Sequence, residues 1–325
     1  MLAHRRVWLQ MLAATALTST RPRIAWALDY PYRPVRIVVG FAAGGATDIL
    51  ARLVGEGLSE RLGQSFIVEN KPGAGTNIAV EAVLGAPADG YTLLFVGPPA
   101  AINATLYDEL SFDFIRDVAP VAAMVRVPFV MTVNPAFQAT TVAEFIAYAK
   151  ANPGKLSMGV PGKGSGPHMA GELFKAMTGV DLITVQYRGD APALTDLMGG
   201  QIQVCFNSLP AAVELIQGGK VRALATTAAN RSDALPNVPT VAEFVADYEA
   251  SAFYGIGAAK STPPAIVDTL HAAINATIAD PAVQTRLAGL GAKALSLSSS
   301  EFGQLIADET TKWAKVIRTA NIKPD

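Results

Sequence analysis

The chain has 325 residues, of which 50% are apolar and 16% are charged, and its formal net charge is −1 at pH 7. This composition excludes a disordered polyelectrolyte, and the chain lacks the basic excess of proteins that bind nucleic acid or anionic membrane surfaces. We therefore expect no nucleic-acid partner.

The first 27 residues have the pattern of a secretory signal. Arg5 and Arg6 precede an apolar stretch that runs from Val7 to about Ser19, and Ala25-Trp26-Ala27 provides a small-x-small cleavage site. The apolar stretch is shorter than the roughly 20 residues that a membrane span needs. The sequence therefore predicts a signal peptide over residues 1–27, cleaved after Ala27, and export to the periplasm.

Two details bear on the export route and on the cellular location of the protein. The segment from His4 to Gln10 resembles a twin-arginine signal, which we favour over the general secretory route. The chain has a single cysteine, Cys205, so it has neither a disulfide framework nor a lipid-anchor cysteine near the cleavage site. Cleavage would leave 22 basic and 27 acidic side chains, a formal charge of −5. These features are typical of a soluble periplasmic protein.

Apolar runs of strand length alternate with amphipathic helices after the signal. Runs of this kind suit strands buried on both faces of a mostly parallel sheet. The helix expected from Asp48 to Leu62 ends at Gly63, a suitable C-terminal stop. The expected strands are Val35 to Val39, Ser65 to Glu69, Tyr91 to Val96, Leu156 to Val160 and Val221 to Ala225. The alternation predicts doubly wound α/β lobes.

The length fits two such lobes. The β-like stretches Pro128 to Asn134 and Ser251 to Ala259 would carry the chain from one lobe to the other and back if they lie side by side. The predicted division is residues 28–128 plus 255–325 for the first lobe and 129–254 for the second. The pentapeptide Thr-Val-Ala-Glu-Phe occurs at Thr141 and again at Thr240, and both copies have the capping-box pattern of a helix start.

Three glycine-rich turns follow predicted strands and precede predicted helices. Such turns let a ligand approach the backbone, and a helix start offers unpaired N–H groups and a positive dipole end. Their place at the carboxyl ends of parallel strands is where open α/β sheets bind ligands. The turns are residues 41–48, 70–77 and 162–168. Their distribution over both halves indicates a cleft for a small anion between the lobes.

Other templates do not match. The glycine spacings fit neither the phosphate-binding loop nor the dinucleotide fingerprint, and the sequence has no paired-histidine or cysteine cluster for a metal, so we expect no cofactor. His168 is the one candidate for a catalytic base, with Ser165 near it. A hydrolase built on this pair is the alternative to a cap or a ligand contact. We expect that the protein is not an enzyme.

At these residues the sequence resembles the Bug (TctC-like) solute receptors of tripartite tricarboxylate-type transporters. The resemblance covers essentially the whole chain after the signal, and its pieces are specific in this order and spacing. They are Pro34-Val35-Arg36-Ile37-Val38-Val39 with residues 41–48, Val68 to Gly75, Ala88-Asp89-Gly90-Tyr91-Thr92-Leu93-Leu94, Tyr187-Arg188-Gly189, Pro192-Ala193-Leu194, Asp196-Leu197, Gly199-Gly200-Gln201 and Leu235-Pro236-Asn237-Val238-Pro239-Thr240.

The resemblance implies a type II-like periplasmic-binding-protein fold whose two lobes close over a carboxylate. It also implies that backbone N–H groups, hydroxyls and ordered water hold the ligand. By position, the expected contacts in the first lobe are Phe41, Gly44, Gly45, Thr47, Asp48, Gly75 and Thr76, and those in the second are Ser165, Gly166, His168 and Asn207. Asp48 has an alternative role as a helix cap that holds only its own turn.

One departure bears on the ligand. Family members commonly read Val-Asp-x-Met-Phe-Asp where this chain has residues 202–207, and both acids are amides here, Gln203 and Asn207. With Asn207 facing the cleft, a ligand ammonium would lose its partner, unless another acid, Asp190 above all, takes its place. The sequence therefore predicts a small carboxylate without an α-amino group, such as a dicarboxylate or an aromatic acid.

The expected function is capture of this ligand and its delivery to the permease subunits of a tripartite tricarboxylate-type transporter. The alternative is a sensor whose closed form docks on a signalling partner. We expect a monomer in either case.

Overall fold

The computed structural model describes residues 30–319 and residue 322, so the predicted signal peptide lies outside the described residues. Strands and helices alternate as expected. The strands are β1 (Val35–Val39), β2 (Phe66–Asn70), β3 (Thr92–Val96), β4 (Val118–Val133), β5 (Leu156–Val160), β6 (Leu182–Gln186), β7 (Val204–Ser208), β8 (Arg222–Thr226), β9 (Ser251–Ala259) and β10 (Lys293–Ala294). Each predicted strand is confirmed to within one residue at either end.

The helices cover the strands. The α-helices are α2 (Ala46–Leu62), α3 (Asn77–Leu84), α4 (Pro99–Leu106), α5 (Phe114–Asp117), α6 (Val142–Ala151), α7 (Gly166–Thr178), α8 (Asp190–Met198), α9 (Leu209–Gln217), α10 (Pro264–Ile278), α11 (Pro281–Gly289) and α12 (Ser299–Thr319). Short 3-10 turns are η1 (Ala74–Thr76) and η2 (Val241–Glu243). No helix of the described residues is long and apolar enough to cross a membrane.

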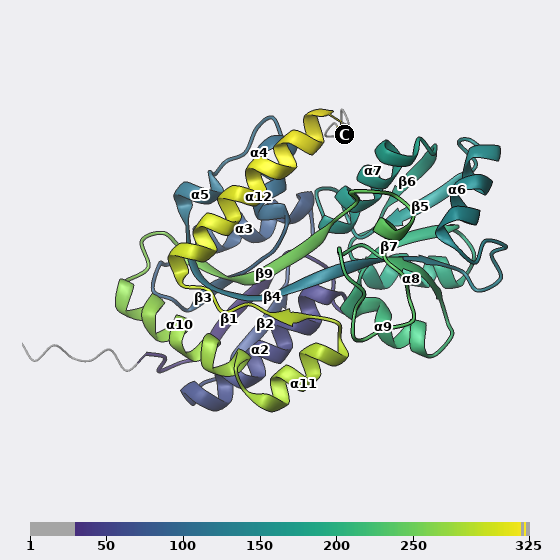
Figure 1. The fold of residues 1–325 in the computed structure, drawn as a ribbon. Helices are drawn as coiled ribbons and strands as arrows, with labels where there is room; N and C mark the ends of the chain where they lie inside the picture. Colours follow the sequence, from purple (N-terminus) through teal and green to yellow (C-terminus); the bar gives the residue numbers. More distant parts are fainter. Residues whose placement is uncertain (1–29, 320–321, 323–325) are drawn as a thin grey trace, which may run out of the picture. The chain divides into compact units, whose positions relative to one another are not determined.

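Two sheets share the long strand β4. In the first sheet, β1 pairs in parallel with β2 and β3, and β9 runs antiparallel between β3 and β4. In the second, β5 pairs in parallel with β6 and β7, and β7 and β8 run antiparallel to β4. Figure 1 shows β4 and β9 side by side, between β1–β3 and β5–β7. The mixed α/β class is therefore confirmed.

The crossing between the sheets differs from the expectation. Ser251 is opposite Pro128 and Ala259 is opposite Val118, so β9 lies beside the segment before Pro128. Residues 129–133 pair with β7 and β8 instead. The antiparallel register carries β9 back along the first half of β4, so of residues 128–134 only Pro128 pairs with β9. The pairing partners of β4 change after Pro128, and the predicted division of the chain into lobes stays a prediction.

Local signals explain most element ends. Gly63 has φ +69° and ends α2 in the left-handed region, and the Thr141 side chain accepts a hydrogen bond from Glu144 N at the start of α6. Thr240 and Glu243 also form a capping box, but it opens only the 3-10 turn η2. The expected helix there is wrong because the chain turns at Asp247 (φ +62°) and buries Tyr248, whose hydroxyl donates to Ala170 O at 2.8 Å.

Apolar packing fixes the strands under the site. Along α2, Leu50, Leu53, Val54 and Leu58 are buried, and the helix packs on β1, β2, α9 and α10. Helices α7, α8 and α9 pack on β7, while α10 and α12 pack on β4. These contacts place the first turns of several helices at the carboxyl ends of the parallel strands.

Candidate functional site

The first turns of five helices meet at one small cavity. Helices α2 and α4 follow β1 and β3 of the first sheet, and α7, α8 and α9 belong to the part built on the second. The cavity has a volume of about 10 Å³, enough for about one water molecule. Its lining residues are Phe41, Thr47, Pro98, Pro99, Pro161, Ser165, Gly166, Pro167, Asp190, Ser208 and Tyr254. Since each helix start carries a partial positive charge, the arrangement favours an anion.

The part of the chain built on β1–β3 and the part built on β5–β7 are the two halves on either side of this cavity. Glycines let them approach each other closely here. A methyl group at Gly45 would lie 3.2 Å from Asp190 Oδ2, and one at Gly44 would lie 3.4 Å from the Ala191 side chain. Gly75 makes a second approach, because a methyl group there would lie 2.9 Å from Lys163 O. These positions explain the small residues in the first two glycine-rich turns.

The carboxylate of Asp190 lies between the halves. Its Oδ1 accepts from Ser208 N at 3.0 Å and from Asn207 Nδ2 at 3.4 Å, both in the β7–α9 segment. Its Oδ2 accepts from Ala46 N, the first residue of α2, at 3.4 Å. Burial raises the pKa of Asp190 to about 6, against the lowering effect of these hydrogen bonds. A carboxyl group of this chain thus contacts the same N–H groups that could hold a ligand anion.

Hydroxyl groups provide the other polar contacts. Thr47, Ser165, Ser208 and Tyr254 line the cavity, and the Ser208 and Tyr254 oxygens are 3.4 Å apart. Burial, together with the charge of Asp190, raises the pKa of Tyr254, so its phenol keeps its proton and can donate to a ligand oxygen.

Ser165 and His168 hold their own turn. The Ser165 hydroxyl accepts from His168 N at 3.2 Å and caps α7, and His168 Nδ1 accepts from Gly164 N at 3.3 Å. His168 Nε2 lies 4.0 Å from a Glu172 carboxylate oxygen. Because His168 Nδ1 accepts a backbone hydrogen bond, this ring nitrogen is not placed as a base for the serine. The geometry fits a cap with a hydroxyl at the cavity better than a nucleophile–base pair.

The remaining predicted ligand contacts differ in whether they line the cavity. Phe41, Thr47 and Gly166 line the cavity, while Thr76 (φ +81°) lines a neighbouring cavity of about 20 Å³ that shares Phe41 and Thr47 with the first. Asp48 turns toward Arg52 Nη2 at 2.8 Å and Gly44 N at 3.0 Å. Burial raises the pKa of Asp48, but these hydrogen bonds outweigh it and hold the pKa below its usual value. The structure therefore favours the alternative in which Asp48 holds its own turn.

Asn207 lies behind the cavity. The side chain is fully buried, its Oδ1 accepts from Thr132 Oγ1 at 3.1 Å, and its Nδ2 reaches Asp190. The residue that lines the cavity at this point is Asp190. Asp190 is therefore the acidic side chain that faces the cavity, and Asn207 supports it from behind.

The sequence pointed to Asp190 only as an acid that could take the place of the one missing at Asn207, and it did not predict Ser208, Tyr254 or the Pro98-Pro99 pair as site residues. Pro98 and Pro99 follow a buried strand and begin a helix, the same strand-to-helix pattern with only one glycine, Gly97, in the turn. Asp190 begins a helix directly after Gly189 (φ +155°), which was a usable signal. No local signal pointed to Tyr254, because it comes from strand β9, which is far from the glycine-rich turns in the sequence.

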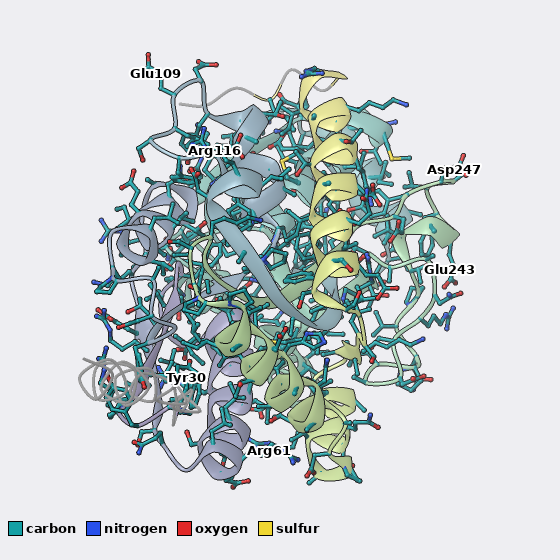
Figure 2. The ribbon with its side chains drawn as sticks, turned by 90° about the vertical axis from the view of Figure 1, so that its left-hand side faces the viewer. Tyr30, Arg61, Glu109, Arg116, Glu243 and Asp247 are labelled. Atoms are coloured by element: carbon teal, nitrogen blue, oxygen red, sulfur yellow. The ribbon has the colours of Figure 1, made fainter. Side chains whose placement is uncertain are left out.

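Charges elsewhere lie mainly on the surface. Figure 2 shows Arg61 and Glu243 at the edge of the molecule, and these residues pair with Asp280 and Arg231. The exposed side chain of Arg116 pairs with Asp117. Exposed pairs of this kind contribute little to stability. Within the described residues, no group of three or more His, Cys, Asp or Glu side chains could hold a metal ion. Cys205 is buried with its Sγ 3.1 Å from Gly159 O, and burial raises the pKa of its thiol.

Comparisons with known proteins identify the family of the chain. Residues 50–322 match the family described as tripartite tricarboxylate transporter family receptor. BugT of Bordetella pertussis is 35% identical over 297 residues, which cover 90% of this chain and 91% of BugT. A protein of R. palustris solved with adipate is 38% identical with a TM-score of 0.89, over 91% of this chain and 100% of that one. MatC of Rhodopseudomonas palustris, solved with bound malate, is 31% identical with a TM-score of 0.84, over 89% and 100%.

The structures that it resembles are those of periplasmic binding proteins, which confirms the two-lobed fold. The match spans most of the chain and the identities exceed 30% over nearly the whole length of the relatives. The chain therefore belongs to the family of periplasmic receptors of tripartite tricarboxylate transporters, the Bug (TctC-like) solute receptors.

Proposed function

We propose that this receptor captures a small carboxylate without an α-amino group, a dicarboxylate or an aromatic acid, and delivers it to the membrane permease of a tripartite tricarboxylate-type transporter. The observation that carries the proposal is the convergence of five helix starts, two from one half and three from the other, on one cavity lined by hydroxyl groups. A carboxylate held there gains N–H and O–H donors from both halves, so binding favours the closed form.

The size of the cavity bears on how the ligand enters. A volume of about 10 Å³ is far too small for a dicarboxylate, so the halves separate to admit the ligand. Gly45 and Asp190 are then pulled apart, because they lie in contact across the cavity. Adipate and malate, which two similar proteins bind, are both dicarboxylates without an amino group, and they support the proposed ligand class.

The site residues that we propose are those the sequence selected together with the cavity-lining residues that it omitted. Thr47, Ser165, Ser208 and Tyr254 would donate hydroxyl hydrogens, and backbone N–H groups near Gly44, Gly45, Gly75 and Gly166 would complete the shell. Phe41 and Thr76 would contact the body of the ligand. His168 and Asn207 would hold the turns from behind. Nothing in this arrangement activates a nucleophile, which supports a receptor without catalysis.

Export and the partner complete the proposal. A signal over residues 1–27 would direct the chain to the periplasm, where the family acts. A sensor role uses the same closed shape, so the alternative in which the closed form docks on a signalling partner shares every residue of the site.

A thermal-shift panel tests the ligand class. Protein stripped of bound ligand by unfolding and refolding is heated with mono-, di- and tricarboxylates, aromatic acids and amino acids. A ligand at a hundred times its Kd adds roughly 2.7 kcal/mol, which is several degrees for a chain of this size. A shift with dicarboxylates or aromatic acids, and a smaller one with amino acids, is expected. If every carboxylate leaves the melting temperature unchanged, the proposal is wrong.

A further inference from the structure

Asp190 is a negatively chargeable group inside a cavity that the proposed function gives to an anion. It lies 5% exposed, with one carboxylate oxygen on Ser208 N and the other on Ala46 N. Those N–H groups open α9 and α2, two of the helix starts that make the cavity attractive to anions. An ionised Asp190 therefore offsets part of the positive potential that would hold the ligand.

A second anion beside an ionised Asp190 is unfavourable. Two carboxylates that share a desolvated site cannot both stay charged, and the pKa of one of them rises strongly. A protonated Asp190 instead gives the cavity one further O–H donor while its second oxygen still accepts from the backbone. Protonation thus converts Asp190 from a competitor of the ligand into a partner.

Neighbouring side chains offer little to neutralise Asp190 otherwise. The ionisable group in the first turn of α2 is Asp48, which is bound to Arg52. Burial and the charge of Asp190 raise the pKa values of Cys205 on β7 and Tyr254 on β9, so both side chains stay neutral. On the α7 side, His168 accepts from Gly164 N, and Lys163 in the preceding turn is buried. The contacts of Asp190 itself are with backbone N–H groups and with the Asn207 amide, which is uncharged.

We infer that Asp190 takes up a proton when the anionic ligand binds at this end of the cavity. The inference rests on the proposed function and names the group that sets its pH dependence. The pKa of about 6 in the ligand-free protein places the residue close enough to neutral pH for a bound anion to shift its protonation.

The number of protons taken up per bound ligand can be measured. Near pH 7.5 the empty protein carries a largely ionised Asp190, and a bound dicarboxylate raises its pKa, so binding takes up close to one proton. Affinity for the dicarboxylate then rises as the pH falls from 8 toward 6.5, by up to about tenfold per pH unit for one coupled proton. A ligand that placed an ammonium beside Asp190 would take up none.

The test is isothermal titration calorimetry with adipate and with malate at pH 7.5, in two buffers of different ionisation enthalpy. The difference in observed enthalpy gives the protons taken up per ligand. The variant Asp190→Asn keeps the shape of the side chain and removes its titration. Asp196→Asn is the matched control, since Asp196 lies in the same helix and accepts a hydrogen bond from the Tyr187 hydroxyl.

We expect uptake approaching one proton in the wild type and in Asp196→Asn, and none in Asp190→Asn, whose affinity is flat between pH 6.5 and 8. Binding of these probes without proton uptake, or the same uptake in Asp190→Asn, overturns the inference and leaves the proposed function intact. If no carboxylate binds the wild type, both fail. The wild-type proton count decides the question even if Asp190→Asn does not fold, and Asp190→Ser provides a second neutral variant.

Discussion

Asp190 Oδ2 accepts a hydrogen bond from Ala46 N, 3.4 Å away, and so joins the first turn of α8 to the first turn of α2. The two residues are 144 positions apart in the chain and follow strands of the two sheets that share β4. Each opens a helix after a glycine, Gly45 in one case and Gly189 in the other. This contact joins the carboxylate of Asp190 to the first turn of α2.

Replacing Gly45 with alanine is expected to weaken ligand binding by roughly tenfold with little loss of folding stability. Gly45 has φ −88°, a conformation open to alanine, so the backbone is not strained. The new methyl group would lie 3.2 Å from Asp190 Oδ2 and would press against it only when the halves close, at a cost of about 1–3 kcal/mol.

Gly289→Ala is the control, because a methyl group there meets nothing within 4 Å. Calorimetric titration with adipate and chemical unfolding of both variants separate binding from stability. Equal affinities of Gly45→Ala and wild type would show that the closed contact is not formed in the complex.

Removing the Ser165 hydroxyl is expected to lower both affinity and stability. As the cap of α7, Ser165 contributes about 1 kcal/mol to the free energy of unfolding. As a donor to a charged ligand oxygen it contributes about 1.5–3 kcal/mol, so Ser165→Ala should weaken binding by roughly tenfold or more. Thr141→Ala removes the corresponding cap of α6, away from the cavity, and should cost stability alone. If the two variants lose stability and neither loses affinity, Ser165 is only a cap.

The ligand-free protein should lose stability as the pH rises from about 4 to 6. Asp190 has a pKa of about 6 when folded and 3.8 as the reference value, so the folded state binds the proton more tightly. Its contribution is fully present below pH 3.8 and is lost as the pH rises through 6, up to about 3 kcal/mol in all. Asp117 and Glu243, whose hydrogen bonds lower their pKa values to about 2, act in the opposite direction but at lower pH.

The measurement is the free energy of unfolding in urea at several pH values. Asp190→Asn should flatten the curve between pH 4 and 6, while Asp196→Asn should leave it as in the wild type. A wild-type curve that is flat over this window would contradict the assignment of the titration to Asp190.

Adding a second acid behind the cavity should impair capture. Asn207 Nδ2 is 3.4 Å from Asp190 Oδ1, so Asn207→Asp places two buried carboxyl groups together and removes a donor. Dicarboxylate affinity at pH 7.5 should fall and should recover in part toward pH 6, where the pair shares a proton. Unchanged affinity across this range, measured by calorimetry, would mean that the two side chains do not interact in the complex.

Regular local signals made much of the fold predictable. Buried apolar runs and the stripe along α2 located strands and helices to within a residue or two, and Gly63 ended its helix as expected. Thr240 misled because a capping box describes only the first turn of a helix, and here the burial of Tyr248 against the distant residue Ala170 stops the helix from continuing. The pairing of β9 with the first half of β4 likewise depends on contacts between residues far apart in the chain.

Local signals likewise predict one part of the site, and tertiary packing provides the rest. Phe41, Thr47, Ser165 and Gly166 follow from the strand–turn–helix pattern, and the structure brings them to one cavity. Tyr254 reaches it from β9 through tertiary packing, which no local pattern encodes. Asp190 follows Gly189 at the start of α8, but only the fold places it between Asn207 and the cavity.

The most direct test of the central claim is calorimetric titration of refolded, ligand-free protein with adipate, malate, an aromatic acid, aspartate and glutamate, followed by mass spectrometry of the recovered ligand. We expect one molecule of a carboxylate without an amino group to bind per chain, more tightly than either amino acid, and to be recovered unchanged. Tighter binding of aspartate or glutamate, or conversion of the ligand, would contradict the account.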